Sequence, residues 1–207
     1  KTFNISAPLI VDVSKVRGIE GNNACLHATA DITLLDVRGT HTGSANPDST
    51  SDDVSRNEMH TLFRNIRFYS NDHVGTAMRV TKTFGLHVVD SHIFNMKHGV
   101  EFYGVNRNIL INACQIWSMS GDGLRFVESD THQFILNACH ISYCYRAFYS
   151  VNSDLYNFEL TGNDIECNKT KYVAPYNLIH IVGGHVEGLT AVGNNFEDHY
   201  IATDYLI

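Results

Sequence analysis

Three acidic residues and one histidine stand at matching places in the second half of the chain. Asp164 and Glu166 lie in "GNDIEC", Glu197 lies in "GNNFED" and His140 lies in "NACHIS". Residues i and i+2 of a β-strand lie about 6.5–7 Å apart on one face, so a carboxyl pair so placed can sample the separation of a retaining or an inverting glycosidase. Neighbouring carboxylates also raise one another's pKa, which a general acid needs. These four are the candidate catalytic residues; the alternative is a solvated strand face.

Aromatic and polar residues occupy the equivalent places earlier in the chain. Tyr69, Phe94 and Trp117 follow one another at intervals of 25 and 23 residues, and His92 and Gln115 stand two positions before the last two. Flat aromatic faces suit the apolar face of a sugar ring, and polar neighbours can fix its hydroxyls. We predict that these five residues bind carbohydrate. Exposed apolar patches also mark protein contacts, so a subunit interface or burial beneath segment 41–58 remains the alternative.

The elements that must position these groups follow from an internal repeat. An apolar anchor residue recurs at intervals of 25, 23, 25, 24 and 31 residues. The anchors are Phe68, Ile93, Ile116, Ile141, Ile165 and Phe196. Self-similarity at such a period is the signature of a repeat architecture, in which stacked units bury a core that no single unit buries.

Other positions of the repeat are equally regular. The position five before each anchor is apolar, and the position three before it holds Asp90, Ala113, Ala138, Gly162 and Gly193, as a chain corner requires. A second strand follows in each unit as "AMRV", "VEFY", "LRFV", "AFYS" and later "IATDYL". An immunoglobulin-like sandwich would not repeat its turns in register, and the Leu-x-x-Leu consensus of leucine-rich repeats is absent. We predict an all-β fold, a right-handed parallel β-helix of about 24 residues per coil.

The same pattern divides the chain. Residues 1–207 are predicted to form a single β-helix domain, with opening coils in 1–40, a polar surface loop in 41–58 and regular coils in 59–207. The segment 167–187 lengthens the last interval and is expected to form a second loop. The start at Lys1 and the apolar end "YLI" suggest a fragment of a longer chain.

Composition excludes several classes of protein. The formal charge of −7 without a basic stripe argues against nucleic-acid binding and favours neutral or weakly charged partners. No apolar run reaches the roughly 18 residues of a membrane helix, and no signal peptide is predicted. The five cysteines form no CxxC pair, so reduced buried thiols are expected.

The remaining polar motifs point to structure rather than chemistry. Glu101 and Arg125 are expected to form a stacked ion pair, and Asp122 and Asp130 to cap the backbone at turns. His132 and His140 lack the spacing of metal ligands, so no metal site and no cofactor is predicted.

Long stretches of the chain resemble a known group. "NISAPLIVDVSKVRGIEGNNA", "GVEFYGVNRNILINACQI", "HISYCYRAFYSVNSDLYNFELTGNDIE" and "LTAVGNNFEDHYIAT" are similar to the pectate-lyase-like β-helix domains of bacteriophage tail spikes and neck appendages. The resemblance implies a homotrimer in the virion tail, contacts with other tail proteins, and recognition of host cell-surface polysaccharide. It implies no catalytic residues, because no shared active-site motif matches. A glycan-degrading hydrolase or lyase and a non-binding structural spacer are the alternatives.

Overall fold

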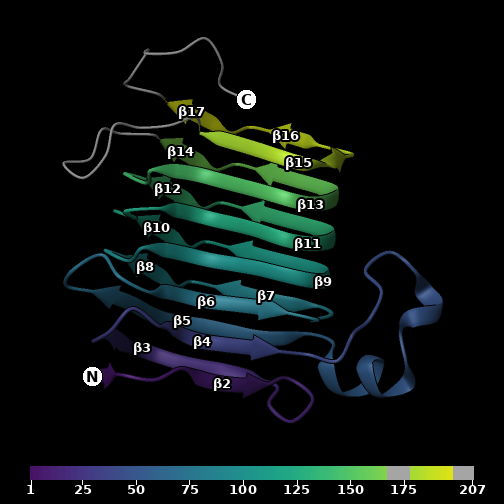
Figure 1. The fold of residues 1–207 in the computed structure, drawn as a ribbon, viewed down its shortest axis with the longest axis horizontal. Helices are drawn as coiled ribbons and strands as arrows, with labels where there is room; N and C mark the ends of the chain where they lie inside the picture. Colours follow the sequence, from purple (N-terminus) through teal and green to yellow (C-terminus); the bar gives the residue numbers. More distant parts are fainter. Residues whose placement is uncertain (167–177, 198–207) are drawn as a thin grey trace.

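The chain forms an all-β stack of parallel strands, consistent with a parallel β-helix (Figure 1). The structure is a computed structural model that describes residues 1–166 and 178–197. Within these residues, helical structure is confined to a 3-10 turn at Pro47–Ser49 and a π-helical turn at Val54–Glu58. The strands are β1 (Thr2–Ile5), β2 (Leu9–Asp12), β3 (Gly18–Ala28), β4 (Thr33–Arg38), β5 (Thr61–Ser70), β6 (Thr76–Thr81), β7 (Leu86–Val89), β8 (His92–Phe94), β9 (His98–Asn112), β10 (Gln115–Trp117), β11 (Asp122–Asn137), β12 (His140–Ser142), β13 (Arg146–Thr161), β14 (Asp164–Glu166), β15 (Ile179–Glu187), β16 (Thr190–Val192) and β17 (Asn195–Glu197).

Strand pairing arranges these elements in three columns. The first contains β2, β4, β6 and the leading parts of β9, β11, β13 and β15. The second contains the leading parts of β3 and β5, then β7, the trailing parts of β9, β11 and β13, and β16. The third, at the left of Figure 1, contains β1, the trailing parts of β3 and β5, then β8, β10, β12, β14 and β17.

The predicted alignment of the anchors is confirmed in the third column. Each anchor pairs in parallel register with the next, from Phe68 through to Phe196. The anchors from Phe68 to Ile165 are fully buried. Alternation along a strand therefore turns the residue on either side of each anchor outward.

Each coil turns a sharp corner between the second and third columns. The residue three before the anchor has a left-handed backbone in every coil, with φ of 52° at Ala113, 51° at Ala138 and 62° at Gly162. The predicted corner is confirmed. Two of the coils use alanine there, although L-residues with a Cβ resist this conformation.

The core is filled by side chains that stack from coil to coil. Phe102 lies against Phe126 and Phe134 against Phe158, each pair with ring centroids 5.0 Å apart. The two pairs meet edge to face, at 5.2 Å between Phe126 and Phe134. Such offset and edge contacts are the favoured geometries of aromatic pairs.

A row of hydrogen-bonding side chains runs through the core beside the corners, two positions before the anchors from Ile93 onward. The backbone N–H of Cys114 donates to Cys139 Sγ at 3.4 Å, and that of Cys139 donates to Asn163 Oδ1 at 2.9 Å. The N–H of Asn163 in turn donates to Asn194 Oδ1 at 3.0 Å. The repeated "NAC" of 112–114 and 137–139 thus supplies acceptors for backbone donors that the turn leaves unpaired.

The thiols behave as the sequence predicts in the described part of the chain. Cys25, Cys114, Cys139 and Cys144 are buried thiols outside any disulfide. A hydrogen bond with Cys139 and burial together raise the pKa of Cys114, so it remains a neutral thiol. Cys167 lies outside the described residues, as do the expected strand "IATDYL" and the first part of the predicted loop 167–187. The prediction of a loop is wrong for the rest of that segment, because Ile179–Glu187 forms the strand β15 and pairs with β13.

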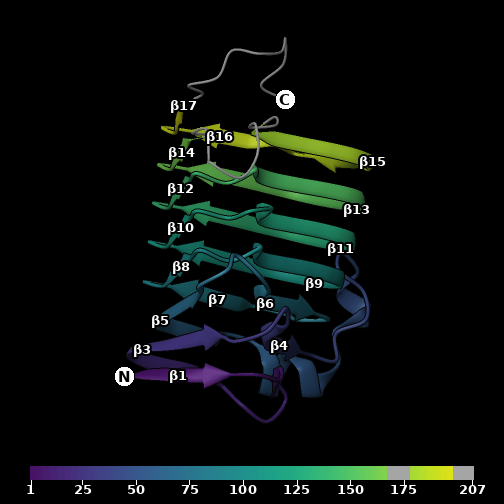
Figure 2. The same ribbon diagram turned by 60° about the vertical axis from the view of Figure 1, so that its left-hand side comes forward.

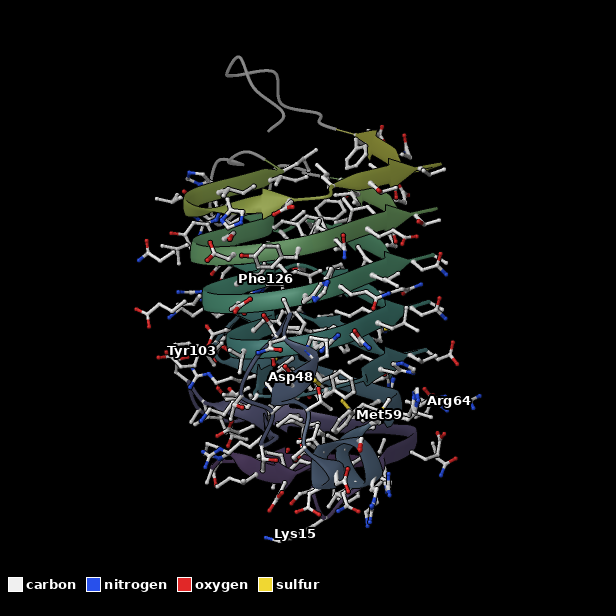
Figure 3. The ribbon with its side chains drawn as sticks, turned by 90° about the vertical axis from the view of Figure 1, so that its right-hand side faces the viewer. Lys15, Asp48, Met59, Arg64, Tyr103 and Phe126 are labelled. Carbon is white, nitrogen blue, oxygen red and sulfur yellow. The ribbon has the colours of Figure 1, made fainter. Side chains whose placement is uncertain are left out.

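Segment 41–58 leaves the stack on the right-hand side of Figure 1, opposite the third column. Figure 3 views the molecule from that side and shows Asp48 in front of the strands. The segment is attached to the stack, because the Ser44 hydroxyl donates to Asp130 and the buried Glu58 carboxylate accepts from the Thr40 N–H at 2.9 Å. No helix within 1–166 or 178–197 has the length and apolar character to cross a membrane.

Candidate functional site

All the predicted site residues lie on the outward face of the third column, which Figure 2 brings forward. One row holds the residues before the anchors and the other holds the residues after them. The first row is Arg67, His92, Gln115, His140, Asp164 and Asn195. The second row contains Tyr69, Phe94, Trp117 and Ser142, and further along the stack Glu166 and Glu197. The alternation of inward and outward residues around the anchors predicts this shared face from the sequence alone.

The aromatic side chains of the second row form one continuous stack with His27. The ring centroids are 4.3 Å apart for His27 and Tyr69, 5.2 Å for Tyr69 and Phe94, and 5.9 Å for Phe94 and Trp117. The interplanar angles of these contacts are 14°, 10° and 12°. Tyr69 and Phe94 are therefore covered on both faces by neighbouring rings and expose only their edges.

Trp117 is the end of that stack and differs from the other rings. One face of its indole lies on Phe94, and the next residue in its row is the small, buried Ser142. The side of the indole toward Ser142 therefore meets no further aromatic ring of the stack, and Trp117 is 37% exposed. The geometry concentrates the predicted sugar-stacking surface on this one ring.

His92 holds the indole in place. The Trp117 Nε1–H donates to His92 Nε2, and the two rings are stacked with centroids 6.0 Å apart. Burial, and secondarily the charge of Arg67, lower the pKa of His92, which keeps its imidazole neutral and able to accept this bond. Gln115, in the same row, is exposed and can meet a ligand directly.

His140, Asp164 and Glu166 form a cluster further along the stack: His140 lies one coil beyond Trp117, and the two carboxylates lie two coils beyond it. His140 Nε2 lies 3.9 Å from Asp164 Oδ2 and 3.8 Å from Glu166 Oε1, and one ligand atom from each residue lies within 4.8 Å of the others. Asp164 Oδ1 accepts from Asn195 Nδ2 at 3.0 Å. Glu197 pairs in register with Glu166 on the adjacent strand. The four predicted catalytic residues are thus neighbours.

Segment 41–58 does not cover this face. It contacts the opposite side of the stack through Ser44 and Asp130, and His41 packs 5.3 Å from the ring of Phe84. Burial of the aromatic stack beneath this segment is therefore wrong as an explanation of the exposed rings. Contact with another subunit is left as the structural alternative.

A second charged cluster lies on the first column and was only partly predicted. The expected pair of Glu101 and Arg125 is confirmed at 3.4 Å, and Glu101 also accepts from Arg79 Nε at 2.7 Å. Strand pairing places these three charges in one row with Asp36. Opposite charges alternate along this row.

Asp122 connects the row to a deeper layer. Its side chain is fully buried at the start of β11, where it accepts from Arg146 Nε at 2.6 Å and faces His98 Nδ1 at 3.4 Å. Both ring nitrogens of His98 have neighbours: the Asp122 backbone N–H donates to Nδ1 at 3.1 Å, and Arg125 Nη1 lies 2.9 Å from Nε2. Burial opposes the ionisation of Asp122, but the hydrogen bonds and charges of His98 and Arg146 outweigh it and lower its pKa.

The prediction that Asp122 and Asp130 cap the backbone at turns is wrong, because the side chains of both residues bind other side chains instead. Both lie within β11; Asp122 binds Arg146, and Asp130 binds Ser44. The "SGDGL" context favoured a turn, whereas the deciding partners come from neighbouring coils. The opposite charges of this second cluster pair with one another between adjacent coils. We therefore assign the cluster to the stability of the stack and not to ligand binding.

The comparisons with known proteins add no relative. No protein-family model matches the chain, and no curated protein is significantly similar to it. The chemistry of the third column must therefore be argued from its residues. They offer one accessible indole face, hydrogen-bonding groups beside it, and a histidine with two carboxylates further along the stack.

Proposed function

We propose that this chain binds a carbohydrate polymer along the outward face of the third column. The observation that carries the proposal is the position of Trp117 at the end of the aromatic stack. Its indole turns one side toward the small Ser142 position, and the cluster of His140 and Asp164 lies just beyond. An aromatic platform next to polar groups is the usual construction of a sugar site.

The arrangement favours a neutral or weakly charged polymer. Two carboxylates lie beside the platform, and the chain carries a net charge of −7, which disfavours polyanions. Successive strands lie about 4.8 Å apart, so a polymer parallel to the stack axis meets a new pair of outward residues at every coil.

The wider proposal rests on the sequence resemblance. In it, the fold is a right-handed parallel β-helix with about 24 residues per coil, part of a bacteriophage tail spike or neck appendage that assembles as a homotrimer in the virion. The ligand is then host cell-surface polysaccharide. Pairing offsets of 23 residues between His92 and Gln115 and 25 between Gln115 and His140 support the coil size.

Substitution of Trp117 tests the binding proposal. Trp117→Ala is expected to weaken binding of purified host capsule or wall polysaccharide about tenfold, since an aromatic contact contributes roughly 0.5–1.5 kcal/mol beyond the area it buries. Tyr103→Ala is the matched control: Tyr103 is an exposed aromatic of β9 outside the third column. Equal affinities of wild type and Trp117→Ala, or loss in the control, would contradict the proposal.

A glycan-cleaving enzyme is the second candidate, favoured by the closeness of Asp164 and Glu166. Their oxygens lie within 4.8 Å of each other, near the short carboxyl separation of retaining glycosidases. Release of new reducing ends, abolished in both Asp164→Asn and Glu166→Gln, would establish cleavage. If the polymer is bound without shortening, the protein is a binder; if it is neither bound nor cleaved, the chain is a structural spacer.

A further inference from the structure

We propose that His140, Asp164 and Glu166 form a binding site for a divalent transition-metal ion of the Zn²⁺ type. This goes beyond polysaccharide recognition and does not depend on it. The sequence predicts no metal site, because His132 and His140 lack the His-x-x-x-His spacing of metal ligands. The stacked strands β12 and β14 bring them together instead, since His140 pairs in register with Asp164.

The distances between His140 and the two carboxylates are too long for direct hydrogen bonds and leave room for an ion between the three side chains. His140 Nε2 lies 3.9 Å from Asp164 Oδ2 and 3.8 Å from Glu166 Oε1. Both distances exceed those of a hydrogen bond. Two ligand atoms bound tetrahedrally to one zinc ion, at bonds of about 2.0–2.2 Å, lie roughly 3.3–3.6 Å apart. The three ligand atoms, which lie within 4.8 Å of one another, must therefore move together by about 1 Å at most to bind the ion.

The state of the imidazole is an independent indication of a ligand. His140 Nε2 is almost inaccessible to solvent, yet no hydrogen-bond partner satisfies it. Burying a polar atom without a hydrogen bond is costly. Ring nitrogens of His41 and His132 are in the same state, but that of His140 differs because it lies 3.8–3.9 Å from two carboxylates. The nitrogen points to the two carboxylates, so a cation between them would satisfy it and offset the repulsion of the two negative charges.

The donor set selects the type of ion. One imidazole nitrogen and two carboxylate oxygens are ligands that Zn²⁺ accepts, with a further position open to water or to a sugar hydroxyl. Ca²⁺ and Mg²⁺ favour sites made entirely of oxygen. Among first-row divalent ions, affinity rises toward Cu²⁺ and Zn²⁺, so Zn²⁺ should bind more tightly than Mn²⁺, Ca²⁺ or Mg²⁺.

The surrounding residues hold the ligands in position. Ile141 and Ile165, the buried anchors next to them, pair in register and fix the two strands. Asn195 donates to the far oxygen of Asp164 at 3.0 Å, which orients that carboxylate toward the cluster. Such outer contacts orient ligands in metal sites.

Another histidine of the chain provides the comparison. His185 Nδ1 lies 2.9 Å from Asp154 Oδ1, a direct ion-pair distance, on a different part of the stack. Within 1–166 and 178–197, His140, Asp164 and Glu166 are the one group of three that is close enough to share an ion. Asp154→Asn is therefore a matched control, since it removes a carboxylate beside a histidine without touching the proposed site.

The experiment is calorimetric titration of tag-free, metal-stripped protein with ZnCl₂. We expect one site in the wild type, affinity at least about tenfold weaker in His140→Ala and Glu166→Gln, and no change in Asp154→Asn. Zn²⁺ should raise the melting temperature of the wild type but not of the two site variants. Co²⁺ should give visible absorption bands that the His140→Ala variant lacks. Circular dichroism of each variant without metal verifies that it folds.

Three results would overturn the proposal. They are the absence of Zn²⁺ binding in the wild type, equal binding in all folded variants, and tighter binding of Ca²⁺ or Mg²⁺ than of Zn²⁺. Measuring polysaccharide binding with EDTA and with Zn²⁺ separates this site from the proposed function. If the protein binds polysaccharide in EDTA but does not bind Zn²⁺, the metal site alone is refuted. If it binds Zn²⁺ but does not bind polysaccharide, the proposed function alone is refuted.

Discussion

Single side chains of this protein act mainly between coils, and Asp122 is the clearest example. Its carboxylate is buried, and its partners Arg146 and His98 come from the following and the preceding coil. A lone buried charge is costly, so removing one member of a buried ion pair destabilises more than the pair itself stabilises.

We predict that Asp122→Asn lowers the free energy of unfolding by about 3 kcal/mol at neutral pH, because Arg146 loses its counter-charge. The pKa of Asp122 is lowered in the folded state. Its stabilisation is therefore complete above the unfolded pKa of about 3.9 and is lost as the pH falls through the lower folded value. Urea titrations should show the difference between wild type and variant shrinking below about pH 4. A difference independent of pH would contradict this account.

The row of hydrogen-bonding side chains beside the corners gives a second prediction at this scale. The Asn163 side chain accepts from the Cys139 N–H and donates to Leu136 O at 2.9 Å. Asn163→Ala leaves both groups unpaired in the core and should cost about 2–6 kcal/mol, at 1–3 kcal/mol for each group. Asn163→Cys should cost less, because cysteine occupies the same place at 114 and 139. Chemical denaturation measures the free energy of unfolding of both variants. An equal loss of stability in Asn163→Ala and Asn163→Cys would show that an acceptor for the Cys139 N–H contributes nothing.

Among the elements, the corners decide where each strand ends. A left-handed residue stands at the same place in every coil, and it is glycine at 162 and 193 but alanine at 113 and 138. A Cβ added to Gly162 would meet no atom within 4 Å. Substitutions at this position therefore measure backbone strain without steric clash.

We predict opposite effects at two equivalent corners. Gly162→Ala should destabilise by about 1 kcal/mol, the cost of a left-handed conformation for an L-residue. Ala138→Gly should stabilise slightly, by roughly 0.5 kcal/mol, since relief of strain exceeds the added freedom of the unfolded chain. Thermal unfolding of both variants checks this. The same sign of change in both would contradict the assigned corner geometry.

Much at this scale followed from the sequence. The anchors, the corner residues and the outward rows were all predicted, because a repeat of fixed period fixes both register and alternation. The partners of Asp122 were not predicted, since a side chain's reach toward the next coil depends on rotamers that the repeat does not encode. The stacking of Tyr69 and Phe94 between neighbouring rings was also not predicted. It depends on the rotamers of the aromatic side chains, which bring the rings of successive coils face to face.

At the scale of the whole molecule, the stack presents one long face assembled from equivalent positions. Contacts in such a solenoid are made mainly between adjacent coils. The aromatic stack, Trp117 and the acidic cluster occupy successive levels of this face. A ligand long enough to span several levels gains contacts from each.

We therefore predict that affinity depends on the length of the oligosaccharide. Binding should strengthen as the chain grows and then level off once it spans from Trp117 to Glu197, three strand spacings or about 14 Å. Calorimetry with size-fractionated fragments measures this. Affinity already at its maximum for a monosaccharide would point to a single pocket instead of an extended face.

Trp117 also has a spectroscopic consequence. It is the single tryptophan of the chain, and it stands at the end of a row of rings with its N–H bound to His92. Excitation at the red edge of the absorption band therefore selects one indole, located on the surface where a ligand is expected. Its emission colour and its quenching by iodide report the occupancy of that face directly, without any label.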